Sequence, residues 1–458
     1  MKVKNICCIG AGYVGGPTMS VIAIKCPQIN ITLVDSDLKK IEAWNGPIDK
    51  LPVFEPGLSD IVRSVRGKNL FFSTDIKGAI EKSEMIFMAV NTPTKKEGKG
   101  AGMAADLSNI EACARDISKY SKSDKIVVEK STLPVRTAEK IKEILIQNKK
   151  GIKFDILSNP EFLAEGTAIK DLFKSDRVLI GGDESESGKK AIKLLIDIYS
   201  NWIKKEKILT TNVWSAELAK LASNAMLAQR ISSINSLSAL CEKSGADVTE
   251  LSKAIGMDHR IGKHFLNASV AFGGSCFKKD ILNLVYLCKY YKLDDVAEYW
   301  LQVVKINEYQ KHRFTEKIIS NSNNDIKNQN IAILGWSFKP NTNDSRESPS
   351  IYVTYKLLQK GAMIKVCDPL VRLNQIKNDL RNFMLSKSLS LKKTEILLNN
   401  ISFSELKEMS FNSFSSIAIL TACPEFKKIE KELIKSKANI YDGCNLFNSK
   451  QFTYTIGK

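Results

Sequence analysis

The sequence predicts an α/β protein with two doubly wound Rossmann-like domains, joined by a central helical segment that contains a long buried helix. Two observations predict this fold. Short apolar strands alternate with helical stretches near both ends of the chain, and the stretch between them is helical, with Arg230 as the only charge between Lys220 and Glu242. We expect domains over residues 1–212, 213–325 and 326–458, because 458 residues are too many for one core.

The N-terminal domain begins with a strand over Lys4–Ile9, which runs into the G-x-G-x-x-G turn Gly10-Ala11-Gly12-Tyr13-Val14-Gly15. A second strand over 31–34 ends at Asp35. The glycines let a pyrophosphate approach the start of the next helix and let that helix pack on the strand. Asp35 would accept ribose hydroxyls and repel a 2′-phosphate. This spacing predicts an NAD site rather than an NADP site.

Further strands of the same sheet are predicted over 85–90, 125–129, 154–158 and 177–181. Polar, Pro-containing loops follow three of them, and their residues are 90–94, 131–134 and 159–166. Such loops can be simple turns. Because ligands collect at the carboxyl ends of parallel strands, three of them at one edge indicate a binding site.

A long helix is predicted over 214–242, where Arg230 is the only charge between Lys220 and Glu242. We expect it to be buried on most sides. Lys220 and Asn224 lie four residues apart and so share one face. A lysine at that place is partly desolvated unless it points to solvent from the outer end of the helix.

A candidate nucleophile lies in the stretch 272–280, Phe-Gly-Gly-Ser-Cys-Phe-Lys-Lys-Asp. The apolar spacing that follows predicts a helix with Ser275 as N-cap and Cys276 as its first residue. The helix dipole and the two adjacent lysines would favour the Cys276 thiolate, and Asp280 would lie one turn further on. The alternative for Cys276 is a small buried apolar side chain.

The second Rossmann-like domain follows an Asn-rich linker over 321–330. Its strands are predicted over 330–334, 362–367, 416–421 and 439–441. The turn after the first of these strands lacks the full glycine fingerprint, so we expect this domain to bind something other than a dinucleotide.

Composition excludes several other classes of protein. The net charge is +18, but the lysines are spread in short pairs without a basic stripe, so we expect no nucleic-acid partner. Three histidines and ten scattered cysteines without a CxxC favour reduced thiols and no metal site. Neither a membrane-spanning run nor an export signal is recognisable, so we expect a cytoplasmic protein without a membrane partner.

The ordered motifs GAGYVGGPT, VNTPT, EKSTLPVR, SNPEFLAEGTAIKDL, ELAKLASNAMLAQR, FGGSCFKKD and GWSFKPNTNDSRES resemble the UDP-glucose 6-dehydrogenases of eukaryotic type, in the UDP-glucose/GDP-mannose dehydrogenase family. The resemblance is strong from Val3 to Pro369 and loose beyond. It implies a four-electron oxidation of UDP-glucose at C6 to UDP-glucuronate with two NAD. A cysteine thiolate captures the intermediate aldehyde as a hemithioacetal, which becomes a thioester that water hydrolyses.

The resemblance also implies roles for individual residues. The catalytic residues would be Cys276 as nucleophile, with Lys220, Asp280, Glu161, Thr132 and Asn224 around it, and the individual proton transfers stay open. NAD would be bound by Gly10, Ala11, Gly12, Tyr13, Val14, Gly15, Asp35, Lys40, Val90, Asn91, Thr92, Pro93, Thr94, Ser131, Thr132, Leu133, Glu165, Lys279 and Arg346. The UDP-sugar would be bound by Glu161, Phe162, Leu163, Ala164, Glu165, Lys220, Asn224, Arg260, Phe265, Leu266, Asn267, Phe272, Gly273, Phe338 and Lys339.

Family members are oligomers, often hexamers, and the resemblance implies at least a dimer in which Arg260 reaches the neighbouring subunit's site. The chain departs from the family pattern at Cys444, where an arginine is expected to help bind the UDP-sugar, and at Pro340, beside Lys339. Three alternatives therefore stay open. They are a dehydrogenase of UDP-N-acetylmannosamine or GDP-mannose, a catalytically inactive nucleotide-sugar-binding protein, and a basic nucleic-acid binder.

Overall fold

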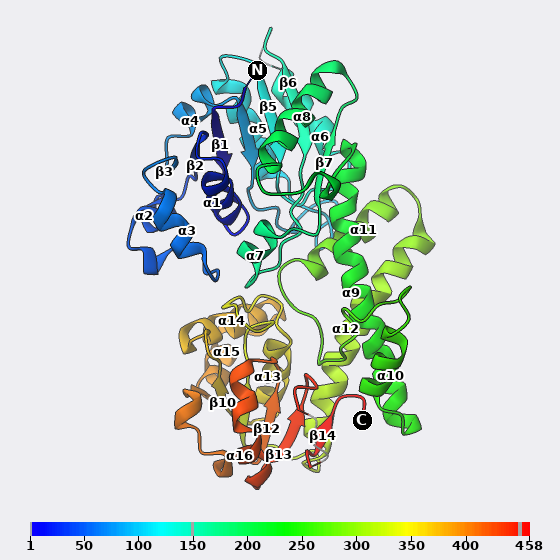
Figure 1. Ribbon diagram of the computed structural model, residues 1–458. Helices are drawn as coiled ribbons and strands as arrows, with labels where there is room; N and C mark the ends of the chain where they lie inside the picture. Colours follow the sequence, from blue (N-terminus) through cyan, green and yellow to red (C-terminus); the bar gives the residue numbers. More distant parts are fainter. Residues whose placement is uncertain (1, 148–150, 448–450) are drawn as a thin grey trace. The chain divides into compact units, whose positions relative to one another are not determined.

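The computed structural model describes residues 2–147, 151–447 and 451–458. They form two compact units, each built around one sheet (Figure 1). Unit 1 contains Met1–Ser223 and Leu282–Tyr291, and unit 2 contains Asn224–Ile281 and Lys292–Lys458.

The sheet of unit 1 has eight strands in the order β3-β2-β1-β4-β5-β6-β7-β8. All neighbours are parallel except β6 and β7, which meet antiparallel through one pair of residues. This order, which grows outward from β1 in both directions, is that of a doubly wound Rossmann fold. The strands are β1 Asn5–Ile9, β2 Asn30–Val34, β3 Leu70–Ser73, β4 Met85–Met88, β5 Lys125–Glu129, β6 Phe154–Ser158, β7 Val178–Gly182 and β8 Ile208–Asn212.

Alternate residues of β1 enter two different cores. Ile6 and Cys8 pack with α1, α3 and α8, whereas Cys7 and Ile9 pack with α4, α5 and α6. Helices therefore cover both faces of the sheet, which explains why its strands are almost continuously apolar. The helices of unit 1 are α1 Gly15–Lys25, α2 Leu38–Asn45, α3 Leu58–Val65, α4 Ile76–Lys82, α5 Ser108–Tyr120, α6 Thr137–Ile146, α7 Ala168–Phe173 and α8 Glu186–Tyr199, with short 3-10 turns at Ile48–Lys50 and Lys205–Lys207.

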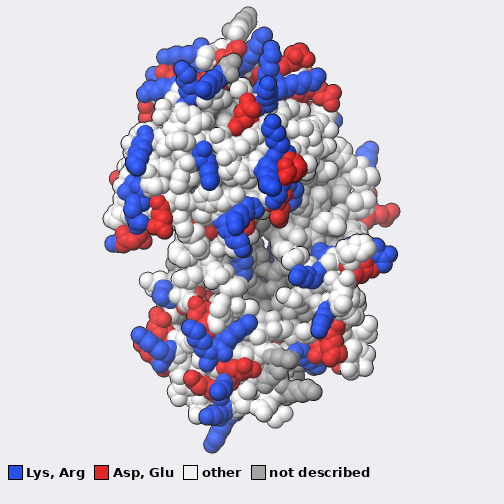
Figure 2. Space-filling view, in the orientation of Figure 1, with Lys and Arg blue, Asp and Glu red and all other residues white. Residues whose placement is uncertain are grey.

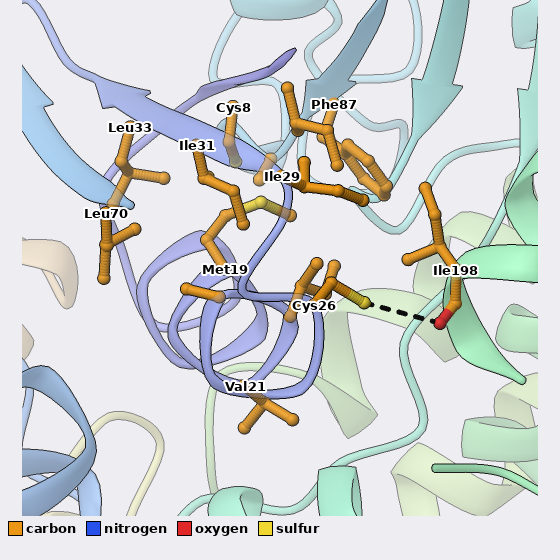
Figure 3. Close-up of a cluster of buried hydrophobic side chains, with 14 of the residues drawn as sticks. Cys8, Met19, Val21, Cys26, Ile29, Ile31, Leu33, Leu70, Phe87 and Ile198 are labelled. Atoms are coloured by element: carbon orange, nitrogen blue, oxygen red, sulfur yellow. Dashed lines mark hydrogen bonds between the residues drawn. The ribbon is translucent and has the colours of Figure 1, made fainter. Parts of the chain in front are cut away.

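Figure 3 shows the first of these cores around α1. Met19 points from the helix towards Ile31 of β2. At the end of α1 the Cys26 thiol donates to the Ile198 carbonyl of α8 over 3.7 Å. Burial raises the pKa of Cys26 to about 11, so this thiol stays neutral and serves as a core side chain.

The sheet of unit 2 has six parallel strands in the order β11-β10-β9-β12-β13-β14. Ile331 and Ile333 of β9 face one core and Ala332 and Leu334 face the other, so this sheet is also covered on both sides. The strands are β9 Asn330–Leu334, β10 Met363–Cys367, β11 Ile401–Phe403, β12 Ser416–Ile419, β13 Asn439–Asp442 and β14 Tyr454–Thr455. The helices of its Rossmann part are α13 Pro349–Gln359, α14 Leu373–Ser386, α15 Leu391–Leu398 and α16 Glu430–Lys435, with 3-10 turns at Leu406–Glu408, Phe411–Ser413 and Pro424–Ile429.

The central part of the chain is helical, as expected. Its elements are α9 Val213–Ser244, α10 Val248–Gly256, α11 Phe277–Tyr290 and α12 Asp294–Ser320. Most residues of the long helix α9 between Lys220 and Glu242 are buried or half-buried, in agreement with the prediction that it is buried on most sides. Met226, Leu237 and Leu240 are exposed, because an uncharged helix can present an apolar face to a partner as well as to its own core.

The surface charge is dispersed. On the face in Figure 2, Lys and Arg are interspersed with Asp and Glu and with wide areas of other residues. Within the described parts of the chain, no helix combines the length and the apolar character needed to cross a bilayer.

Candidate functional site

The glycine-rich turn of unit 1 lies between β1 and α1 and has no room for side chains at its first and last glycine. Gly10 has φ +110°, and a Cβ there would lie 2.5 Å from the Ala89 carbonyl oxygen. A Cβ on Gly15 would lie 2.1 Å from the Gly10 carbonyl oxygen. These two glycines therefore allow close packing of the turn. A Cβ on Gly12 would meet nothing within 4 Å, so the turn is open there to a ligand at the start of α1, as a pyrophosphate requires.

Asp35 follows β2 and its carboxylate lies beside this turn. It accepts the Ala11 N–H at 2.9 Å and pairs with the Lys40 ammonium at 2.9 Å. Burial opposes its ionisation, but the hydrogen bonds from Lys40, Asp37 and Ala11 outweigh burial and lower the pKa of Asp35. The carboxylate is thus ionised at neutral pH, with lone pairs left for hydroxyl donors.

The loops after β4 and β5 are hydrogen-bonded to each other. The Thr92 hydroxyl donates to the Thr132 carbonyl at 3.0 Å, and the Ser131 hydroxyl donates to the Val90 carbonyl at 2.6 Å. Residues expected to contact NAD from separate segments are therefore neighbours at one edge of the sheet. They are brought together by strand order, as the sequence predicts for parallel strands.

The loop after β6 and helix α9 contribute a buried ion pair. Glu161 and Lys220 are 8% and 4% exposed, and their charged atoms lie 3.0 Å apart. The second oxygen of Glu161 accepts the Leu163 N–H at 2.9 Å, which folds the loop back on its own carboxylate. The expectation that Lys220 is desolvated agrees with this burial, and a pair removed from water in this way can move protons or steady a developing charge.

A cavity of about 300 Å³ opens beside this pair in unit 1. Its lining includes Glu161, Phe162, Leu163 and Arg177, and the Arg177 guanidinium stacks 3.8 Å over the Phe162 ring. The cavity therefore has one aromatic wall and charged groups of both signs, a lining that suits a polar ligand.

Sequence reasoning missed Lys130, which also lines this cavity. Its ammonium donates to the Asn159 side-chain oxygen at 3.0 Å, and the Tyr199 hydroxyl donates to the same oxygen at 2.6 Å. Burial lowers the pKa of Lys130 to about 8, with Glu161 opposing the shift and Lys220 reinforcing it. A lysine at the end of an apolar strand has no distinguishing pattern, so only the packing identifies it.

Sequence reasoning also missed two buried carboxyls beneath the loop after β5. Glu217 of α9 is 2% exposed and accepts the N–H groups of Arg136 and Ala138, each at 2.8 Å. Burial raises the pKa of Glu217 to about 7. Glu129 is 1% exposed, and its burial, with the neighbouring Glu217 carboxylate, raises its pKa well above the ordinary value. Glu129 therefore keeps its proton at neutral pH.

This pair predicts a pH-dependent stability. The pKa values of both carboxyls are raised in the folded protein, so the protons that they bind stabilise the fold. This contribution to stability is complete below pH 4.5, the pKa of a glutamate in the unfolded chain, and is lost as the pH rises through about 7. The glutamine of Glu129→Gln is neutral without binding a proton. The free energy of unfolding of this variant, minus that of the wild type, should therefore rise by roughly 1 kcal/mol per pH unit from pH 5 towards 7. Urea denaturation at pH 5, 6 and 7.5 measures this, with the exposed Glu143→Gln as control. Parallel pH profiles for wild type and Glu129→Gln would contradict the interpretation.

In unit 2, α11 begins at Phe277, one residue later than predicted. Cys276 therefore precedes the helix, and its carbonyl accepts the first helical hydrogen bond, from the Asp280 N–H at 2.9 Å. The prediction that Ser275 is the N-cap is wrong by one position, because the Gly-Gly turn delays the helix. Cys276 is exposed, whereas Cys444 is half-buried and the other eight cysteines are buried, so the alternative of a buried core thiol is wrong.

Asp280 is 2% exposed, and its partners include Asn224 and Lys279. The Asn224 amide donates to it at 2.6 Å, and the Lys279 ammonium lies 3.5 Å away. Lys278 differs from the expectation that both lysines support a thiolate at Cys276, since its ammonium pairs with Glu347 at 2.9 Å and with Glu308 at 3.7 Å. Its charge is therefore largely neutralised by carboxylates.

The loop that carries Cys276 is fitted closely against the loop after β9. A Cβ on Gly273 would lie 2.8 Å from the Glu347 carbonyl oxygen, and one on Gly274 would lie 2.9 Å from the Phe338 ring. The Gly274 N–H also donates to the Arg346 carbonyl at 2.9 Å. Because these glycines have no side chains, Phe338 and Arg346 can lie beside the cysteine loop, although they are more than 60 residues away in the sequence.

The remaining expected residues of unit 2 lie in varied surroundings. Arg260 is paired with Asp258 at 2.6 Å on an exposed loop, and Phe265 has φ +61° and is 42% exposed. Leu266 and Phe272 are buried, Asn267 is exposed, and the Lys339 ammonium lies 5.5 Å from the centre of the Phe338 ring.

The position of Cys444 carries no positive charge. Its thiol donates to the Ile419 carbonyl over 3.6 Å, and its N–H donates to Asp442 at 2.9 Å. Burial, reinforced by Asp442, raises the pKa of Cys444 well above its ordinary value, so the thiol is neutral. Nor do the described residues bring together three His, Cys, Asp or Glu side chains in a way that could hold a metal ion.

Sequence models of three domains match this chain in order. They are described as the NAD binding domain of the UDP-glucose/GDP-mannose dehydrogenase family over residues 4–203, its central domain over 214–309 and its UDP binding domain over 332–449. Together the matches cover most of the chain.

Individual proteins are similar over nearly the whole length. UDP-glucose 6-dehydrogenase 4 of Arabidopsis thaliana is 53% identical, with 99% of this chain and 97% of that protein covered. UDP-glucose 6-dehydrogenase 1 of Glycine max is 52% identical with the same coverage. Among solved structures, a UDP-glucose dehydrogenase from Pyrobaculum islandicum superposes with a TM-score of 0.82 at 27% identity, over 99% of this chain and 96% of the other.

Proposed function

Because the chain belongs to the UDP-glucose/GDP-mannose dehydrogenase family, we propose that it oxidises UDP-glucose at C6 to UDP-glucuronate, with two NAD reduced per sugar. The family and the NAD-binding domain make it an NAD-dependent oxidoreductase. The single observation that carries the choice of substrate is the identity of about half of all residues to UDP-glucose 6-dehydrogenases across nearly the full length.

The glycine-rich turn fits NAD. Gly10 and Gly15 allow close packing of the turn, and the open space at Gly12 lets a pyrophosphate approach the backbone N–H groups at the start of α1. Asp35, kept ionised by Lys40, suits the two ribose hydroxyls and disfavours a 2′-phosphate. NAD, when bound, accepts one hydride from C6 at each of the two oxidations.

Cys276 supplies the covalent step in this proposal. Its sulfur adds to the C6 aldehyde to form a hemithioacetal, and loss of a second hydride from C6 leaves a thioester. Water then attacks the thioester carbon, the C–S bond breaks, and the carboxylate and the thiol are released. The exposed thiol at the start of α11 supports this role, since a nucleophile must be accessible and a helix N-terminus favours the thiolate.

Buried polar pairs supply proton transfer and charge stabilisation. The Glu161–Lys220 pair has one acidic and one basic partner in a desolvated place, and the Asn224–Asp280 pair fixes a carboxylate one turn after the cysteine. We assign Lys220 to stabilising the developing oxyanion and Asp280 with Glu161 to activating water, with Thr132 completing the polar set. These groups also argue against a catalytically inactive binding protein.

The substrate assignment is tested by kcat/KM for three purified nucleotide sugars with NAD. UDP-glucose should exceed UDP-N-acetylmannosamine and GDP-mannose by at least about 100-fold, the discrimination expected when a polar site is built for one ligand. A preference for either other sugar would reassign the substrate within the family. Turnover of none of them would favour a protein that only binds nucleotide sugars.

Cys444 should weaken UDP-sugar binding, because it is neutral where the family has an arginine. A charge-assisted hydrogen bond contributes roughly 1.5–3 kcal/mol, so Cys444→Arg should lower the KM for UDP-glucose about tenfold or more with little change in kcat. Cys444→Met is the matched control, since it adds bulk without charge. An unchanged or higher KM in Cys444→Arg, in a variant of normal melting temperature, would contradict the prediction.

A homodimer is the smallest assembly we propose. Met226, Leu237 and Leu240 are exposed on α9 and lie within about 60° of one another around the helix. Such an apolar stripe on an otherwise polar surface is typical of an interface between copies. Light scattering should show at least a dimer for the wild type and a smaller particle for Leu240→Glu, and a monomeric wild type would contradict the assembly.

A further inference from the structure

Glu55 is a buried carboxylate that the proposed chemistry does not use. It lies between α2 and α3 and is 5% exposed. Its two oxygens accept the Gly166 N–H at 2.6 Å and the Ala168 N–H at 3.1 Å, across more than a hundred residues of sequence. Glu55 therefore holds the end of the loop 161–166, the loop that begins with Glu161.

The residue before it contacts the cofactor turn. The hydroxyl of Tyr13, inside the glycine-rich turn, donates to the Phe54 carbonyl at 2.6 Å. Residues 54 and 55, which we call the strap, thus link the turn after β1 to the loop after β6. Glu55 accepts a hydrogen bond from the first residue of helix α7. This helix also packs against α1, the helix that follows the glycine-rich turn.

The other end of the loop 161–166 is held by the catalytic pair. Glu161 accepts the Leu163 N–H and pairs with Lys220. The middle is held by Asp171, whose carboxylate accepts the Ala164 N–H at 3.0 Å. A movement of Gly166 therefore passes through only a few residues before it reaches the Glu161 carboxylate.

We infer that the strap couples the dinucleotide site to the loop 161–166, with Glu55 as a positioning residue that sets the place of Glu161. Occupancy of the glycine-rich turn fixes Tyr13, Tyr13 fixes Phe54, and the Glu55 carboxylate transmits this to two N–H groups of the loop. By reciprocity a ligand on the loop tightens NAD binding by the same factor. The naming of that ligand as UDP-glucose rests on the proposed function, whereas the coupling itself does not.

Hydrogen exchange measures the coupling without any substrate. In the wild type, saturating NAD should slow amide exchange in peptides covering 161–168 by about fivefold or more, the low end of measured couplings. In Tyr13→Phe and in Glu55→Gln, each also saturated with NAD, the slowing should fall below about twofold. Peptides from α8 serve as the internal reference, and Asp60→Asn, an exposed carboxylate of α3, is the matched control.

Ligand affinities give a second test, because they should change differently if Glu55 couples the two sites than if it only stabilises the fold. In Glu55→Gln the KM for UDP-glucose should rise about tenfold, while the dissociation constant of NAD for the free enzyme changes less than about twofold. The double variant Tyr13→Phe/Glu55→Gln should lose no more coupling than either single variant, because both break the same link.

Two results would overturn the inference. One is NAD-dependent slowing that persists undiminished in both variants, and the other is additive losses of coupling in the double variant. A wild type that binds NAD and slows exchange in 161–168, but does not turn over UDP-glucose, would overturn the proposed substrate and support the strap. Tyr13→Phe removes only a hydroxyl from a half-buried ring, so the test survives if Glu55→Gln folds poorly.

Discussion

Cys276→Ala should abolish UDP-glucuronate formation, with a loss in kcat of roughly a thousandfold or more. Without the sulfur no hemithioacetal can form, and this covalent intermediate is the donor of the second hydride. The first oxidation remains possible, so a carbonyl trap should capture an aldehyde from the variant but not from the wild type. Product analysis by mass spectrometry measures both outcomes.

The control for this variant is Cys288→Ala, a buried cysteine further along α11. It should keep nearly full activity, because its thiol only packs in the core. UDP-glucuronate formation by Cys276→Ala at a rate near that of the wild type would contradict a covalent mechanism.

Lys220→Met should lower both activity and stability. Its partner Glu161 is 8% exposed and would be left as a buried carboxylate without the cation 3.0 Å away. Breaking a buried pair costs about 3 kcal/mol or more, and loss of the charge that steadies the oxyanion should reduce kcat by roughly 10²- to 10⁴-fold. Urea denaturation and initial rates measure the two effects separately.

A double variant separates the structural effect of this pair from its chemistry. Lys220→Met/Glu161→Gln removes both charges, so it should regain much of the lost stability while remaining inactive. A double variant no more stable than Lys220→Met, or one with restored turnover, would contradict the account of this pair.

Much of the fold follows from the sequence because buried parallel strands are apolar and evenly spaced. Strands β5, β6 and β9 have the predicted boundaries. The strands that were missed lie at or near sheet edges. Most of β8 is exposed and three of its five residues are polar, β11 has three residues and β14 has two, so neither alternation nor a run of apolar residues marks these three strands. The edge strand β3, Leu70–Ser73, was also missed, although three of its four residues are apolar.

The candidate site was predictable where its residues fall in motifs and hidden where they depend on packing. The glycine turn, Asp35 and Cys276 each have a local pattern. Lys130 and Glu55 do not, because their partners Asn159 and Gly166 lie far away in the sequence and only the tertiary structure brings these groups together. The antiparallel orientation of β7 relative to β6 was equally hidden, since a strand of five apolar or glycine residues gives no direction.

We propose that one active site carries out both oxidations through Cys276. The most direct test is the amount of NADH released per UDP-glucose consumed by the wild type, followed to completion with limiting sugar. We expect two NADH per sugar, with UDP-glucuronate as the sole product and no aldehyde trapped. One NADH per sugar with an accumulating aldehyde would contradict it, because the second oxidation would then not occur on this enzyme.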